Sequence, residues 1–224
     1  MQAYAEGSGH IDLAKRLDIP NSQSLAIGGS ANTRIIRTTL KHSYQATEPT
    51  FYVLGMTFLS RLEVPILKNL SEFEGRWCNP QNQEFKSRWE HNWTDRDSEV
   101  FVELKLKTEV YSILDRLEDL QYKMLSLVSD LKSRGHGVVM YQQADNLYQE
   151  FLDHPRMLPI AKCPEIIDGY RWRAVSWQLK NGVPPMYRET TIHNVPDDMH
   201  HPAPGHHALL NEYLKNYITE HKLF

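Results

Sequence analysis

The hydrophobic positions of the chain alternate between a strand pattern and a helix pattern. Phe51–Met56 is an almost continuously apolar run, which is typical of a parallel strand that is buried on both faces. A shorter apolar run, Ser24–Ile27, ends at Gly28–Gly29, and we expect Ser30 to be the N-cap of a helix that extends to about Tyr44. This strand–helix–strand order predicts a right-handed parallel crossover unit.

The same alternation continues towards the C-terminus. The pattern predicts a short helix at His10–Leu17, a long helix from about Ser98 to Ser133, a buried strand at Val138–Gln142 and a final helix at Gly205–His221. The long helix repeats apolar residues every three or four positions, which favours core packing over a coiled-coil seam. The members of this apolar stripe are Val110, Leu114, Leu117, Met124, Val128 and Leu131.

Alternating strands and helices predict an α/β fold in which a parallel sheet lies between two layers of helices. We expect one domain over residues 1–224, with the Trp-rich segment 68–97 as an insertion. In such folds ligands bind beyond the carboxyl ends of the strands. The segments expected at that edge are Gly28–Asn32, Gly55–Thr57 and Gln142–Asp145.

Composition excludes several classes of function. A formal net charge of −3 and scattered Lys and Arg residues give no basic stripe for a nucleic acid. Cys78 and Cys163 are too few and too far apart for a disulfide framework or a metal motif, so a reducing compartment is expected. No apolar run approaches a membrane span, and the first ten residues lack the pattern of a secretion signal. We therefore expect a cytoplasmic protein with neither a nucleic-acid nor a membrane partner.

The densest group of chemically active residues is the run from Asp197 to His207. Asp198 stands three residues before His201, and a carboxylate at that distance can orient an imidazole as general base. A polar loop that happens to be rich in histidine is the alternative. A metal site is a weaker alternative, because the histidines lack helical zinc-ligand spacing and have no obvious acidic or Cys partner.

Three segments resemble the conserved blocks of the SGNH (GDSL-type) hydrolases. Asp198-x-x-His201-Pro202 resembles the last block, which supplies two members of a Ser-His-Asp triad. Ser24–Ile35 resembles the second block, in which a backbone N–H, here that of Gly29, binds the oxyanion. Phe51–Thr57 resembles the third block, and the runs Arg34–Leu40 and Gly55–Glu63 are similar to SGNH-like proteins of bacteriophages. The resemblance implies a three-layer, flavodoxin-like parallel sheet and no cofactor.

The chain departs from the family pattern at two points. Thr57 stands where the family has an oxyanion-binding Asn, and a lost donor of this kind typically costs about 10²–10³ in turnover. The first block, Gly-Asp-Ser, has its nearest counterpart in Gly7-Ser8-Gly9. Either Ser8 is the nucleophile on a shortened edge, or the chain lacks the first block.

The resemblance implies a serine esterase, acetylesterase-like, that acts on an ester of a small molecule or carbohydrate. Ser8, His201 and Asp198 would form the triad, Gly29 and Thr57 would bind the oxyanion, and Asn32 would contact substrate. The alternative is a non-catalytic SGNH-like phage structural or interaction protein without a nucleophile. Helix 98–133 would then serve a virion partner or a homo-oligomer, and the place of action would be the host cytoplasm or the virion.

Overall fold

The chain is a mixed α/β protein that contains a small parallel sheet. The computed structural model describes residues 9–25, 31–57, 59, 64–66, 76–78, 113–143, 149–181 and 204–224. The helices and strands in chain order are α1 (Gly9–Arg16), α2 (Asn32–Gln45), β1 (Phe51–Met56), β2 (Val64–Ile66), β3 (Arg76–Cys78), α5 (Ile113–Ser133), β4 (Gly137–Gln142), α6 (Ala174–Lys180) and α7 (Pro204–Glu220). The 3₁₀ segments are η2 (Gln149–Asp153), η3 (Ile160–Lys162) and η4 (Ile167–Tyr170).

Strands β1 and β4 pair in parallel, from Phe51 opposite Gly137 to Met56 opposite Gln142. On the other side of β4, Met140 forms a parallel bridge with Ile166 and Gln142 forms one with Arg173. A third, irregular segment therefore flanks β4 at the position of a further strand. Strands β2 and β3 pair antiparallel in a sheet of their own.

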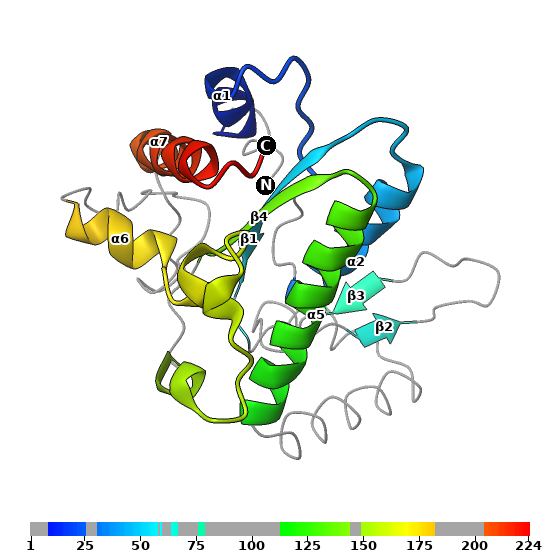
Figure 1. Cartoon of the computed structure of the whole chain (residues 1–224), viewed down its shortest axis with the longest axis vertical. Coiled ribbons are helices and arrows are strands. Elements are labelled where there is room, and N and C mark those ends of the chain that lie inside the picture. The colour runs from blue at the N-terminus through cyan, green and yellow to red at the C-terminus, as the bar shows by residue number, and fades with distance from the viewer. Residues whose placement is uncertain are drawn as a thin grey trace, which may run out of the picture.

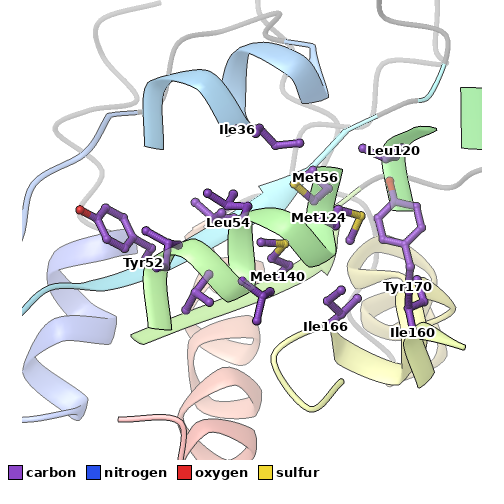
Figure 2. Packing of buried hydrophobic residues seen from close by; sticks show 14 of the residues in the cluster. Ile36, Tyr52, Leu54, Met56, Leu120, Met124, Met140, Ile160, Ile166 and Tyr170 are labelled. Carbon is purple, nitrogen blue, oxygen red and sulfur yellow. The ribbon is translucent and has the colours of Figure 1, made fainter. Parts of the chain in front are cut away.

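Helices pack against both faces of the β1–β4 pair (Figure 1). On one face, Leu54, Met56 and Met140 pack with the buried residues of α2 and α5 (Figure 2). On the other face, Val139 and Tyr141 pack with Leu13 of α1 and with Leu210, Leu214 and Ile218 of α7. Because successive side chains of a strand point to opposite faces, the sheet contributes residues to two separate apolar clusters, one on each face.

Helix α5 buries a continuous apolar stripe. Leu117, Met124 and Leu131 are fully buried, as the helical spacing of the sequence predicts. At the C-terminal end of the helix, Gly135 adopts φ +77° and the N–H of His136 donates to Leu131 O at 2.9 Å, which is the hydrogen bond of a Schellman cap. This cap turns the chain directly into β4.

The sequence-based elements agree with the structure to different extents. The strand predicted at Phe51–Met56 is confirmed. The helices predicted at the positions of α1, α2 and α7 are present, and their ends differ from the predicted ends by one or two residues at most. The strand predicted for Ser24–Ile27 is wrong for Ser24 and Leu25, which belong to no strand, and its remainder lies outside the described residues. Residues 98–112 of the predicted long helix and most of the predicted insertion also lie outside them.

Candidate functional site

The carboxyl ends of β1 and β4 meet at one edge of the sheet. Met56 and Gln142 are the last residues of the two strands and lie opposite each other in the register. Helix α2 begins at Asn32 beside this edge, because the side chain of Asn32 contacts Thr57, which directly follows β1. Ligand sites of open parallel sheets lie at this edge.

Asn32 and Thr57 form a paired contact at the carboxyl edge. The backbone N–H of Thr57 donates to Asn32 Oδ1 at 2.7 Å, and Asn32 Nδ2 donates to the carbonyl of Thr57 at 3.1 Å. Both residues are buried, with 5% and 8% of their surface exposed. The side-chain amide thus pairs with the backbone as a neighbouring strand would, and it fixes the position of Thr57 relative to helix α2.

Tyr170 completes this group from the segment that flanks β4. Its hydroxyl donates to the carbonyl of Thr57 at 3.3 Å, and its side chain is fully buried. Burial raises the pKa of Tyr170 far above its usual value, although a hydrogen bond with Asn32 opposes that rise. Tyr170 therefore remains a neutral hydrogen-bond donor. We call Asn32, Thr57 and Tyr170 the carboxyl-edge cluster.

The backbone at Tyr170 has an uncommon conformation. Asp168, Gly169 and Tyr170 have φ of 47°, 57° and 72°, so three consecutive residues lie in the left-handed region. For a bulky aromatic residue this conformation costs on the order of 1–3 kcal/mol and requires compensation from its surroundings. The complete burial of Tyr170 and its hydrogen bond to Thr57 supply that compensation.

Gln142 lies at the same edge but is not bonded to the cluster. Its side chain is 1% exposed, and neither Nε2 nor Oε1 has a hydrogen-bond partner in the described parts of the chain. Arg116, in the first turn of α5, likewise has buried Nε and NH1 atoms without a partner there. Buried polar groups without partners are rare in folded proteins and call for an explanation.

The structure places two of the six predicted site residues. Thr57 and Asn32, expected at the oxyanion and substrate positions, lie together at the carboxyl edge. The other four, Ser8, Gly29, Asp198 and His201, lie outside the described residues. Among the described residues, no group of three or more His, Cys, Asp or Glu side chains has the arrangement of a metal site.

A cleft of about 200 Å³ lies at the opposite, amino-terminal edge of the sheet. Its polar side chains centre on Glu165, which accepts hydrogen bonds from Lys132 and, at 3.2 Å, from Cys163 Sγ. Burial raises the pKa of the Cys163 thiol to about 11, so the thiol stays protonated and is a poor nucleophile. The complete lining is Lys132, His136, Gly137, Val138, Pro164, Glu165, His221, Lys222 and Leu223.

Trp172 and Trp177 pack against α7 through aromatic contacts. The ring of Trp172 stacks on Tyr213 with the centroids 4.4 Å apart, and Trp177 lies 4.8 Å from the same tyrosine ring. Tyr141 contacts Trp172 edge-on from strand β4. These contacts are aromatic core packing between the sheet, α6 and α7.

Sequence reasoning did not identify Tyr170 or Gln142. The sequence predicts the segment Gln142–Asp145 at the ligand edge, but a glutamine at a strand end carries no distinctive pattern of its own. Tyr170 follows Asp168-Gly169, a pair typical of turns, and this was the one local signal of an unusual backbone. Its approach to Thr57 spans 113 residues and depends on the fold.

Comparison with known proteins gives no relative to guide the assignment. No protein family, no curated protein and no solved structure matches the chain. Within the described residues, no helix has both the length and the apolar character that a membrane crossing requires.

Proposed function

We propose that the chain is an SGNH-type serine esterase, acetylesterase-like, whose active site lies at the carboxyl edge of β1 and β4. The observation that carries the proposal is the double hydrogen bond between Asn32 and Thr57. These residues belong to the segments that resemble the second and third SGNH blocks, and they meet at the edge where such enzymes bind the substrate carbonyl. Helices on both faces of the parallel pair also fit the three-layer, flavodoxin-like arrangement of that family.

The mechanism follows from the residues that the resemblance assigns. Ser8 attacks the ester carbonyl while His201 accepts its proton, and Asp198 holds the imidazole in the required tautomer. The N–H of Gly29 stabilises the oxyanion with assistance from Thr57, whose position the carboxyl-edge cluster fixes. His201 then returns the proton to the leaving alcohol, and water hydrolyses the acyl-enzyme. The substrate is an ester of a small molecule or carbohydrate, met in the host cytoplasm or the virion.

A fluorophosphonate probe tests this proposal directly. The expected result is one adduct per chain at Ser8, identified by peptide mass, together with hydrolysis of p-nitrophenyl acetate. Ser8→Ala and His201→Ala should both abolish labelling. Ser133→Ala is the matched control, because Ser133 is exposed at the far end of α5 and hydrogen-bonds to Asp130. An adduct at a different serine would support the assignment as a serine hydrolase but would show that Ser8 is not its nucleophile.

A non-catalytic SGNH-like module, a structural or interaction protein of a phage, is the second candidate. It is favoured by the state of Asn32, whose carboxamide is engaged on both its oxygen and its nitrogen by the backbone of Thr57. A polar side chain used in this way stabilises the fold and is less free to bind a substrate. Absence of both labelling and esterase activity in a folded protein would select this candidate, with α5 (Ile113–Ser133) as the first surface to test for partners.

A further inference from the structure

Helix α7 ends in the same Schellman cap as α5. The N–H of Leu223 donates to Ile218 O at 3.1 Å, and Lys222, the residue before the donor, has φ 52°. The corresponding residue of the α5 cap is Gly135, with φ 77°. Glycine adopts this conformation without strain, whereas lysine adopts it at a cost in stability. The geometry of the cap therefore does not explain why a lysine stands at this position.

Lys222 lines the cleft at the amino-terminal edge of the sheet, where the end of α7 reaches the turn between α5 and β4 (Figure 1). The described side chains around the cleft include four basic ones, those of Lys132, His136, His221 and Lys222, and the carboxylate of Glu165. The cleft measures about 200 Å³, whereas about 10–15 Å³ is enough for one water molecule. A small ligand therefore has room in it.

The carboxylate of Glu165 is satisfied within the protein. Its two oxygens accept hydrogen bonds from Lys132 Nζ and from Cys163 Sγ, and the residue is 5% exposed. This contact uses one N–H of the Lys132 ammonium and leaves two on a side chain that is 58% exposed. Lys222 adds a second positive charge and has no ion-pair partner among the described residues. The cleft is therefore rich in unused donors.

Each histidine of the cleft has one ring nitrogen bonded to the backbone. The N–H of Thr50 donates to His136 Nδ1 at 3.1 Å, so the proton of this ring is on Nε2. His221 Nδ1 lies 3.0 Å from the carbonyl oxygen of Tyr217, which can only accept. In the neutral His221 ring the proton is therefore on Nδ1, and Nε2 is an acceptor. Neither Nε2 has a partner among the described residues.

We propose that this cleft binds inorganic phosphate as the monohydrogen phosphate dianion. The ammonium groups of Lys132 and Lys222 and the Nε2–H of His136 donate to the ionised oxygens, and His221 Nε2 accepts from the protonated oxygen. Sulfate has the same charge and a similar shape but no proton for His221. The cleft lies at the edge opposite the carboxyl-edge cluster, so this inference is independent of the proposed esterase function.

The first test is a titration of the whole chain with sodium phosphate at about pH 8, with sodium chloride keeping the ionic strength constant. Long-range proton–nitrogen NMR spectra follow the imidazoles of His136 and His221, and His154, outside the cleft, is the internal reference. We expect saturable shifts at the two cleft histidines only, and at least about fivefold weaker binding of sulfate. Equal binding of sulfate would overturn the proposal. So would the absence of saturable shifts, because the two lysines would then only offset the partial negative charge of the helix ends.

The second test separates the two roles of Lys222. Lys222→Gly suits the positive φ of the cap, so its Tm should equal or exceed that of the wild type, by up to about 2–4 °C. Its Kd for phosphate should nevertheless rise at least about fivefold, because one ammonium donor is lost. Lys123→Gln removes one positive charge from an exposed position of α5 and is the matched control, with an unchanged Kd. An unchanged Kd in Lys222→Gly, or an equal rise in both variants, would overturn the inference.

Discussion

Asn32 and Thr57 pair side chain to backbone in the manner of two adjacent strands, through hydrogen bonds of 2.7 and 3.1 Å. The contact joins the start of α2 to the end of β1, which are separated by 25 residues of the chain. It forms where the parallel strands β1 and β4 end together. Loss of this pair should therefore affect the carboxyl edge before any other part of the sheet.

Asn32→Ala should lower the free energy of unfolding by about 2–3 kcal/mol, because the buried N–H of Thr57 loses its acceptor. Urea denaturation measures this change. Asn181→Ala is the control: its amide donates to Trp177 O, but the side chain is exposed, so a change within about 0.5 kcal/mol is expected. Equal effects of the two substitutions would contradict a structural role for the Asn32–Thr57 pair.

Tyr170→Phe should have a smaller effect than Asn32→Ala. The substitution removes one hydrogen bond of 3.3 Å, but the carbonyl of Thr57 keeps the bond from Asn32. We expect a loss of about 0.5–1.5 kcal/mol in the same urea assay. Tyr170→Ala also removes a fully buried ring and should cost about 3–5 kcal/mol. If Phe and Ala destabilised the protein equally, the hydroxyl and not the ring would dominate, contrary to this assignment.

Local patterns were sufficient to predict the elements that form the two-stranded sheet and its helical cover. The apolar run Phe51–Met56 predicted β1 because a strand covered by helices has few polar residues; Tyr52, Leu54 and Met56 are buried and the alternate residues are half-buried. The apolar stripe predicted α5 for a comparable reason, and the predicted end at Ser133 agrees with the structure. In each case neighbouring residues carry the whole signal.

Contacts between distant residues could not be predicted in this way. The position of Asn32 at a strand–helix junction identified it as a candidate, but its pairing with Thr57 requires the crossover geometry. The conformation of Tyr170 is harder to predict from the sequence, because an aromatic residue disfavours the left-handed region and is held there by tertiary contacts. The triad residues Ser8, His201 and Asp198 remain predictions from the sequence.

A comparison of the stabilities of Gly169→Ala and Gly135→Ala distinguishes the cost of backbone strain from the cost of a steric clash. Both glycines have positive φ, 57° and 77°, so alanine should cost about 1–2 kcal/mol at either position for the backbone alone. A Cβ at Gly169 would also lie 2.8 Å from the Cα of Ala161, whereas nothing lies within 4 Å at Gly135. The loss at Gly169 should therefore reach about 2–5 kcal/mol. If chemical denaturation gave equal losses in the free energy of unfolding for the two variants, η3 would accommodate the new Cβ at residue 169 without cost.

The Glu165–Lys132 pair should make stability dependent on pH in the acidic range. Burial acts to raise the pKa of Glu165, but the hydrogen bonds from Lys132 and Cys163 outweigh it and hold the pKa below 4.5. A carboxylate with a lowered pKa stabilises the fold above its unfolded-state value, and this contribution is lost as pH falls through the folded-state value. The stability difference between wild type and Glu165→Gln should therefore be constant from about pH 6 to 8 and shrink below about pH 4.5.

Asp119→Asn, which removes an exposed partner of Lys123, is the control and should give a small difference at every pH. A difference for Glu165→Gln that grew as the pH fell would require a raised pKa and would contradict the pairing.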